Sequence, residues 1–489
     1  MSNQILPKET MPARQEGQHR ASICFDPFLR GSVFQITAQI LIRLLGFVST
    51  LLVANGLGPN GFGQTSAVIA FGMLALPLMD LGVDTHLIRL LAKDDGSRRT
   101  LVRQALLLKV GLGVAVTTVF FLVGLVGGAR VGLPEANHLL IFTGIVLVLV
   151  RALPSTWSAC LRADGLLGWD ALAQTTGKLL DMVFIILALN WQATPIGALT
   201  GFLAAALVQT ALYAMLGRPR GADRIPTAPS SFRLLVQGGI PFALTGISVS
   251  IYTQGTLLIL AAQSGDQEAG WFRAASLITI AVTGLSGALA ISLFSTLSSA
   301  PASAVTSILR RALSFGLLLG LPVAVGGTIT AQPLINWLFK PEYAPAAAIL
   351  QILVWWVPVV FLTNLLGNGL GALGHQRDVF RISLLNVFVS LGLASVLVPM
   401  FGGCGAAIVT LVTETVGLVF LLAVTKARQS SQAINCLIFG RTLLATTPLL
   451  ALIPLRDHCT PPVLLAAGCC LTILGVIMTG SWRDVLVER

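Results

Sequence analysis

The chain alternates between long apolar segments and short polar connections. Most apolar segments have about 20 residues, the length at which an α-helix crosses the hydrocarbon core of a bilayer. They are too long and too continuously apolar for membrane-barrel strands, in which polar and apolar residues alternate, so helices are expected. The pattern predicts about fourteen spans, with approximate limits 32–54, 65–85, 104–127, 138–159, 173–190, 195–216, 235–262, 271–296, 311–335, 345–370, 378–400, 403–425, 436–454 and 461–480.

Composition places the chain in a membrane rather than in water. Hydrophobic residues make up 55% of the 489 residues and charged residues only 10%, with a mean hydropathy of +0.85. Soluble domains carry about 25% charged residues. The seven cysteines show no CxxC pair and no histidine at metal-ligand spacing, so neither a metal site nor a disulfide framework is predicted. No nucleotide-binding loop is present either, and no cofactor is expected.

The positive charges fall mainly on one side of the predicted spans. If odd-numbered spans leave the cytoplasm, 22 of the 31 Lys and Arg residues lie in cytoplasmic segments, three on the opposite side and six within spans. Positive residues concentrate on the cytoplasmic side of membrane proteins, so both termini are predicted to be cytoplasmic. This distribution explains the pI of about 9.8 without a nucleic-acid partner. Residues 1–30 lack an apolar core, so no cleaved signal peptide is expected.

The connections divide the chain into two lobes of six spans and a final pair of spans. The connection after the sixth span is rich in Pro, Gly and Arg, which predicts a linker between two six-span lobes. The predicted domains are a cytoplasmic tail (1–30), an N-lobe (31–217), a cytoplasmic linker (218–234), a C-lobe (235–426), and a final segment with spans thirteen and fourteen and a cytoplasmic C-terminus (427–489).

Several charged residues fall deep within predicted spans. Arg43 lies near the middle of the first span, where an arginine costs about 2.5–3.5 kcal/mol on insertion scales. We therefore expect it to face water, a partner or a polar cavity. The other deep charges of the first lobe are Arg151, Lys178 and Asp181, so cations outnumber acids by three to one. A basic cavity favours an anionic cargo, because guanidinium groups pair with phosphate through two hydrogen bonds. Arg43, Arg151 and Lys178 are the predicted substrate-binding cations.

These charges also have structural interpretations. Lys178 and Asp181 are three residues apart on one helix, so a local ion pair is an equal alternative to a cavity role. Arg43 and Arg151 could instead form buried pairs between helices. Lys109 lies near an interface, where its amino group is expected to reach water. Arg273 lies at the external end of its span and is expected among lipid headgroups.

Acidic and amide side chains give further candidates. Asp80 and Asp84 stand one turn apart beside His86 and Arg89, which favours an ion network at a cytoplasmic gate. The candidates for a gate or for ion coupling are Asp80, Asp84, Asp181 and Glu414. Amides at depth can bind sugar hydroxyls, but they also join helices. The candidates for glycan contact are Gln254, Asn364, Asn368 and Asn386.

Three stretches of the chain resemble a known group of transporters. The first, 41–89, contains LGPNGFG after the first span and DLGVDTHLIR at the end of the second; the others are 334–353 and 367–414, the latter with FGGCGAA. In order and spacing they are similar to the bacterial polysaccharide transporters, the O-antigen flippase branch of the multidrug/oligosaccharidyl-lipid/polysaccharide (MOP) superfamily. The chain departs from that pattern at Gln254, where an acidic residue is common, and at Ser295, where a proline is common.

The resemblance implies an all-α polytopic membrane protein with a MATE-like fold. In that fold two six-helix lobes surround a central cavity, and two further helices follow at the C-terminus. The implied activity is transport rather than catalysis. An undecaprenyl-diphosphate-linked oligosaccharide would cross the bacterial inner membrane by alternating access, for exopolysaccharide, capsule or O-antigen synthesis. The implied partners are this lipid-linked oligosaccharide, the lipid bilayer and a polysaccharide polymerase or export complex.

Other functions are open on the same fold. A cation-coupled multidrug exporter would be better served by deep carboxylates in the first lobe, whereas the deep set here is mainly basic. A flippase for peptidoglycan lipid precursors would use the same mechanism with a different headgroup. A membrane glycan polymerase or ligase needs a large external domain or loop. The predicted external connections are short and hold no convincing carboxylate pair.

Overall fold

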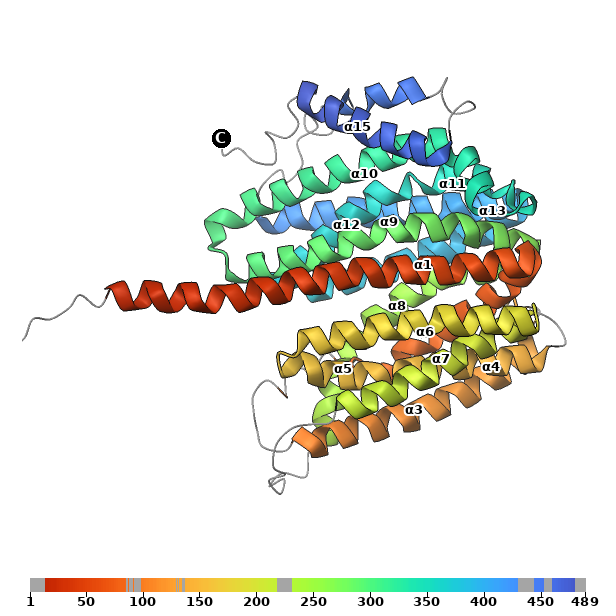
Figure 1. Cartoon of the computed structure of the whole chain (residues 1–489), viewed down its shortest axis with the longest axis horizontal. Helices are drawn as coiled ribbons and strands as arrows, with labels where there is room; N and C mark the ends of the chain where they lie inside the picture. The colour runs from red at the N-terminus through yellow and green to blue at the C-terminus, as the bar shows by residue number, and fades with distance from the viewer. Residues whose placement is uncertain are drawn as a thin grey trace, which may run out of the picture.

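The computed structural model of the chain describes residues 14–84, 87, 91, 98–128, 130, 132–133, 137–217, 231–429, 444–452 and 460–479. Every regular element in this part is a helix, and the helices lie side by side in a bundle (Figure 1). The α-helices are α1 (Arg14–Asp80), α3 (Arg98–Gly127), α4 (His138–Ala152), α5 (Pro154–Ala163), α6 (Leu167–Trp191), α7 (Pro195–Leu216), α8 (Ser231–Ser264), α9 (Asp266–Ser299), α10 (Ala302–Leu338), α11 (Ala346–Leu353), α12 (Trp356–Ala372), α13 (Gln376–Gln429) and α15 (Pro461–Thr479). Two short 3₁₀ helices are η2 (Pro341–Tyr343) and η3 (Thr447–Leu452).

Two of the helices each contain a pair of predicted spans. In α1 the break is at Gly58 (φ 70°), and in α13 it is at Gly402 (φ 54°). Both residues adopt left-handed backbone conformations that glycine tolerates without a steric penalty. Because the remaining backbone is helical, α1 and α13 are 67 and 54 residues long, far more than one crossing requires. The first twelve predicted spans therefore all fall on helices.

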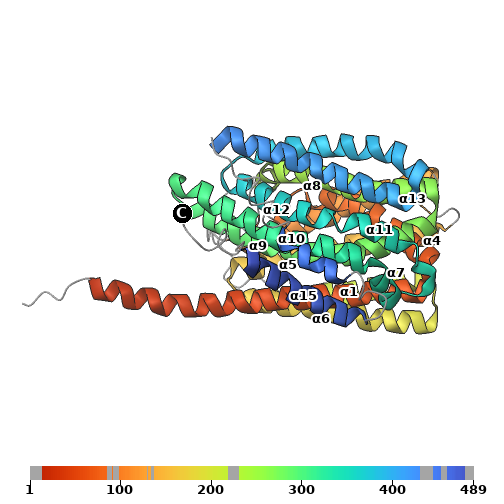
Figure 2. The same cartoon turned by 90° about the horizontal axis from the view of Figure 1, so that it is seen from above.

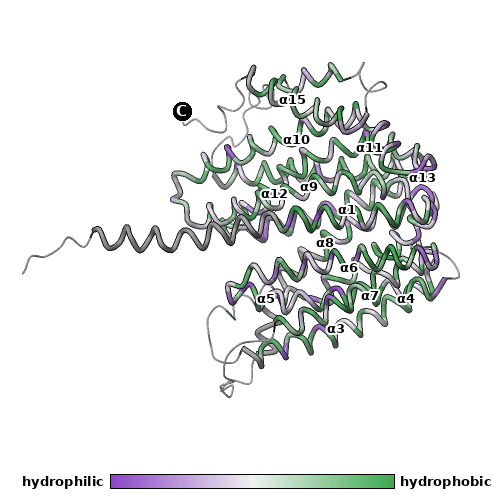
Figure 3. The backbone as a smooth tube through the Cα atoms, viewed as in Figure 1, coloured by the Kyte–Doolittle hydropathy of each residue, from purple (hydrophilic) through white to green (hydrophobic). Residues whose placement is uncertain are grey.

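The membrane prediction is confirmed at the level of fold class. Within the described residues, nine helices are long and apolar enough to cross a membrane, or ten if the bent pair α11 and α12 is one span. Hydrophobic residues predominate along the helices (Figure 3). The total of fourteen spans stays a prediction, because most of 436–454 lies outside the described residues, as does 218–230 of the predicted linker. Helix α1 already begins at Arg14, within the predicted tail, and extends beyond the other helices (Figure 2).

The largest apolar core joins both halves of the chain. It contains Val68 of α1 and Ile145 of α4 together with Leu260 of α8 and Ala274 of α9, all almost completely buried. Helix α1 lies between the group α3–α7 and the group that includes α9, α10 and α12 (Figure 1). At the C-terminal end, η3 and α15 pack on α10. The two halves thus share one continuous apolar interface, and α1 packs against helices of both halves.

Hydrogen bonds close this interface at the end of the bundle that holds Gly58. The Asn55 side chain donates to Leu338 O (2.9 Å) and accepts from Lys340 N (3.1 Å), and the Tyr343 hydroxyl donates to Ala54 O (2.7 Å). On the other arm of α1, Gln64 Nε2 donates to Asp266 Oδ2 (3.1 Å), and Gly63 packs against the backbone of Asp266 so closely that a side chain would not fit. These contacts between residues 54–64 and 266–343 define the closed end of the bundle.

Candidate functional site

A cavity of about 130 Å³ lies within the bundle next to the closed end. The two arms of α1 form one wall, and α4, α6, α7 and α9 form the rest. Its lining residues are Gly46, Ser49, Thr50, Val53, Phe62, Thr65, Ser66, Ile69, Arg151, Lys178, Asp181, Phe202 and Arg273. Hydroxyl groups and charged groups thus share the wall with apolar side chains, a composition that suits a polar ligand.

The charged part of the wall comes from three helices. Asp181 of α6 is 5% exposed and pairs with two cations: Oδ1 is 2.8 Å from Arg151 Nη2 of α4, and Oδ2 is 2.8 Å from Lys178 Nζ. The two cations keep 34% and 30% of their side-chain surface exposed. Arg273 of α9 lines the same cavity, and no hydrogen bond or ion pair joins it to a described residue. Three cations and one carboxylate give this wall an excess of positive charge.

Local structure explains how each cation is presented. Arg151 lies in the last turn of α4, which ends at Ala152 just before Pro154 starts α5. Its guanidinium carbon lies 4.9 Å from the centre of the Phe202 ring on α7, a cation–π contact that holds the plane of the group. Lys178 and Asp181 are one turn apart on α6 and therefore face the same side. The predicted local ion pair is thus present and both residues line the cavity, while the substrate-binding role of Lys178 stays a prediction.

The prediction for Arg273 was wrong. The apolar pattern placed the start of its span near residue 271, but α9 begins at Asp266. Arg273 therefore lies about two turns inside the helix. It faces α1 rather than the headgroups, because residues 266–270 already form the closed end. The sequence signal that could have located it is the acidic start of α9, since Asp266 and Glu268 are favourable in a first helical turn.

Arg43 lies outside this cavity. Its side chain is exposed, and its guanidinium group lies against Gly284 of α9, where a methyl group would overlap Nη1. Gly287, one turn further along, is also close to it. No hydrogen bond or ion pair joins Arg43 to a residue in the described part of the chain. The structure therefore brings Arg151 and Lys178 together, but not Arg43 with them.

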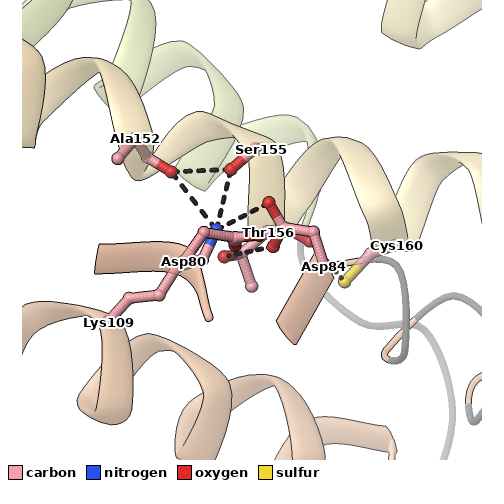
Figure 4. Close-up of polar contacts among 7 residues, drawn as sticks. All are labelled: Asp80, Asp84, Lys109, Ala152, Ser155, Thr156 and Cys160. Carbon is pink, nitrogen blue, oxygen red and sulfur yellow. Dashed lines mark hydrogen bonds and ion pairs between the residues drawn. The ribbon is translucent and has the colours of Figure 1, made fainter. Parts of the chain in front are cut away.

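Asp80 and Asp84 form the ion network that their spacing predicted, with a different partner (Figure 4). Lys109 Nζ lies 2.8 Å from Asp80 Oδ1 and 2.6 Å from Asp84 Oδ2, and it donates to the Ser155 hydroxyl (2.8 Å). The expectation that Lys109 reaches water was wrong, because the residue is only 1% exposed. Two carboxylates and a hydroxyl compensate the ammonium group for its loss of hydration. The predicted neighbours His86 and Arg89 lie outside the described residues.

A second buried carboxylate, Asp170, was not predicted. It is completely buried and accepts hydrogen bonds from Arg162 Nε (2.8 Å), Ser158 Oγ (2.6 Å), Gln174 Nε2 (3.0 Å) and Tyr213 OH (2.9 Å). These partners join α5, α6 and α7. The sequence gives little sign of this network, because a single aspartate in a short predicted connection usually lies in water.

In the second half, Glu414 is separate from the cavity. It is 8% exposed and accepts from the Tyr252 hydroxyl (3.3 Å), while the Tyr252 carbonyl accepts from Ser390 Oγ (3.2 Å). Glu414 and Asp181 are therefore not brought together in one site.

The four candidate amides differ in what they contact. Asn364 of α12 donates to Ser286 Oγ of α9 (2.7 Å), Asn368 donates to Asn364 O (2.9 Å), and Asn386 is buried against Gly417. No hydrogen bond from Gln254 to a described residue is present. Glycan contact by these residues stays a prediction, and Asn364 and Asn386 fit the alternative of joining helices.

The Tyr343 hydroxyl at the closed end has a shifted pKa. Tyr343 lies in η2, outside the spans, and burial raises the pKa of its hydroxyl, with a smaller contribution from the neighbouring Glu342 carboxylate. The hydroxyl is therefore protonated at neutral pH and remains a donor to Ala54 O.

The chain is similar to known proteins in its sequence family and in its fold. The family model "Polysaccharide biosynthesis protein" matches residues 28–301, more than half of the chain. The structure is similar to "Lipid II flippase MurJ, inward closed conformation", with a TM-score of 0.78 and 15% identity over 93% of this chain and 100% of that one. It is also similar to an inward-facing MATE family multidrug resistance transporter of the MOP superfamily, with a TM-score of 0.65 and 16% identity over 82% and 99% of the two chains. No curated protein matches the sequence.

Both solved structures are below 25% identity, so they establish the fold alone. The fold class predicted from the sequence, an all-helical multi-pass membrane protein of MATE-like architecture, is confirmed. The match covers α1–α9, including every helix that contributes to the charged cavity wall. The chain belongs to the polysaccharide biosynthesis protein family, and its fold is that of the flippases and transporters of the MOP superfamily.

Proposed function

We propose that the protein is a flippase that moves an undecaprenyl-diphosphate-linked oligosaccharide across the bacterial inner membrane. The observation that carries this proposal is the cavity wall with Arg151, Lys178 and Arg273, in which three cations are accompanied by a single carboxylate, Asp181, that pairs with two of them. Burying uncompensated positive charge is costly, so its presence favours an anion that enters the cavity.

The donors in the wall fit a diphosphate. A guanidinium group has five N–H donors and an ammonium group has three. Arg151 and Lys178 each use one donor on Asp181, and Arg273 uses none on the described residues. Phosphate oxygens accept several charge-assisted hydrogen bonds at once, and arginine can bind two of them in parallel. The hydroxyls of Ser49, Thr50 and Thr65 donate to backbone carbonyls of α1, so in this structure they offer the cavity acceptor oxygens, and Ser66 adds a fourth hydroxyl to the wall.

Arg43 fits an earlier position on the same path. It lies ten residues before Val53 on α1, which is about 15 Å along the helix axis and away from the closed end. We propose that it contacts the diphosphate first, after which the diphosphate moves to the cavity. The polyprenyl tail would stay in lipid, and the glycan would occupy the water-filled space between the halves.

The closed end supports alternating access between the predicted N-lobe and C-lobe. The hydrogen bonds between the halves are individually weak, because each contributes about 0.5–1.5 kcal/mol net. Rocking of one half against the other could exchange these contacts for contacts at the opposite end. In this proposal the closed end is periplasmic, both termini are cytoplasmic, and a polymerase or export complex receives the cargo. Asp80 and Asp84 would stabilise the cytoplasmic side of the N-lobe.

The test is transport by the full chain in liposomes that contain fluorescent undecaprenyl-diphosphate oligosaccharide. Replacing Arg273, Arg151 or Lys178 by Ala should lower the rate by about tenfold or more, as expected when about 1.4 kcal/mol of binding is lost. The matched control is Arg381→Ala, which removes an exposed cation of α13 whose partner is Asp378. Equal transport by all four variants would contradict the cavity assignment.

The same assay separates the alternatives. A lipid-linked peptidoglycan precursor shares the diphosphate, and its transport in place of the oligosaccharide would assign the protein to that substrate class. A multidrug exporter would move cationic dyes, which the positive wall disfavours. Transport of dyes without transport of lipid-linked glycan would overturn the proposed function.

A further inference from the structure

We propose that Asp181 is an internal substitute for the phosphate group of the cargo, a carboxylate that occupies the cations while the cavity is empty and must be displaced when cargo binds. This inference rests on the proposed function, because it assigns a role within the same cavity. It makes Asp181 a determinant of affinity and release rather than a group that only holds helices together.

The first argument is geometric. The two carboxylate oxygens of Asp181 each meet a different cation, Arg151 Nη2 and Lys178 Nζ, both at 2.8 Å. Two oxygens of one phosphate group would meet the same pair of donors in the same way. The carboxylate is 5% exposed, whereas the two cations remain about a third exposed and line the cavity. An entering anion therefore reaches the cations directly and competes with Asp181 for them.

The second argument comes from comparison with Asp170 of the same helix. Asp170 is fully buried, has four donors from α5, α6 and α7, and neither it nor any of its partners lines the cavity. Its arrangement is that of a carboxylate that joins helices. Asp181 has two donors, both cavity cations, and one of them lies on its own helix. Its position fits control of the cations better than support of the bundle.

Charge balance gives the third argument. The charged groups that line the cavity with Asp181 are Arg151 from α4, Lys178 from α6 and Arg273 from α9, while α1 and α7 present hydroxyls and Phe202. Without Asp181 the wall would carry three positive charges, and a diphosphate would bind so tightly that its release would be slow. With Asp181 present, the carboxylate re-forms its ion pairs with Arg151 and Lys178 as the diphosphate leaves. Tight binding without release would not support transport.

The experiment measures binding of inorganic pyrophosphate to the purified full chain by isothermal titration calorimetry. Asp181→Asn keeps the size of the side chain but removes the competing charge, so we expect pyrophosphate to bind about tenfold more tightly than to the wild type. Turnover of lipid-linked oligosaccharide in liposomes should fall, because release becomes slower. Asp181→Glu restores a carboxylate and should return affinity toward the wild-type value. Asp378→Asn, on the cytoplasmic side of α13 by prediction, is the control and should leave affinity unchanged.

The opposite sign overturns the inference. If Asp181 only orders Arg151 and Lys178, Asp181→Asn will bind pyrophosphate equally or more weakly, and the inference is wrong. Failure of Asp181→Asn to fold, shown by loss of its thermal transition while Asp181→Glu melts normally, also assigns a structural role and overturns it.

The outcomes distinguish this inference from the proposed function. If the wild type moves lipid-linked oligosaccharide while Asp181→Asn binds pyrophosphate more weakly, the proposed function stands and the inference fails. If Asp181→Asn binds more tightly but the wild type moves no such lipid, the competition stands and the choice of cargo fails.

Discussion

At the residue scale, the helices carry charged side chains of two kinds. Lys109 and Asp170 lie at the centre of complete sets of partners, and their interactions hold neighbouring helices together. Arg273 and Arg43 have no acceptor among the described residues, and both face α1 or α9 where the two halves meet. Charge without an internal partner costs more than charge with one, so only the second kind points to a ligand.

Gly284 provides a test of the role of Arg43. A methyl group at residue 284 would overlap the Arg43 guanidinium, whereas at Gly287 it would lie 3.9 Å from Nη2, an ordinary contact. Gly284→Ala should therefore displace Arg43 and reduce transport of lipid-linked oligosaccharide about as much as Arg43→Ala does. Gly287→Ala, one turn away on the same helix, is the matched control and should retain wild-type transport.

Combining the two changes shows whether they act through one contact. Residues that share an interaction give non-additive effects. Arg43→Ala with Gly284→Ala should thus transport no more slowly than Arg43→Ala alone. A further loss in the double variant would show that Gly284 acts through helix packing instead.

At the element scale, the sequence predicts where helices cross the membrane better than how they are rotated. The length and composition of a span must match the bilayer, so hydropathy locates helices such as α3 and α7 well. Lipid-facing and neighbour-facing surfaces are both apolar, so hydropathy does not say which side of a helix faces the bundle. For this reason Asn364 could not be distinguished from a glycan contact, whereas Arg273 was misplaced because α9 begins at Asp266, before the predicted start of its span. The spacing of Lys178 and Asp181 was informative because a helix fixes which residues share a face.

The hydrogen bonds of the closed end join separate structural elements, and substitutions can remove them. Asn55→Ala and Tyr343→Phe together remove three bonds between the halves, to Leu338 O, from Lys340 N and to Ala54 O. At about 0.5–1.5 kcal/mol each, this loss should shift the population toward states that are open at this end. Double electron–electron resonance between spin labels at positions 191 and 337, in a chain without its native cysteines, should show a larger population at long distance.

A nearby hydrogen bond provides the control for that measurement. Trp271 Nε1 donates to Glu342 O (2.8 Å), and both residues belong to the second half. Trp271→Phe therefore removes a bond of the same kind without separating the halves. If it broadens the distance distribution as much as the double variant does, the contacts across α1 are not what keeps this end closed.

At the scale of the whole molecule, the sequence pattern predicts the fold class correctly but not how the residues of the site are arranged in space. Runs of apolar residues and the glycines at the turns of α1 and α13 are enough to predict a multi-pass helical protein. The cavity depends on contacts between residues far apart in sequence, such as Arg151 with Asp181 and Arg273 with α1. A single sequence does not show such pairs, so the prediction named Arg151 and Lys178 but also included Arg43, which lies outside the cavity, and left out Arg273, which lines it.

The orientation of the molecule in the membrane is the remaining prediction at this scale. The excess of Lys and Arg predicts that the closed end lies outside the cytoplasm and the start of α13 inside. Trp191 is 93% exposed and lies near the closed end, while Arg381 has 76% of its side chain exposed at the other end of the bundle. In spheroplasts of a strain whose chain lacks native cysteines, a membrane-impermeant maleimide should label Trp191→Cys at once. It should label Arg381→Cys only after the membrane is permeabilised. The reverse pattern would place the diphosphate cavity nearer the cytoplasm, and the direction of transport proposed for this protein would have to be inverted.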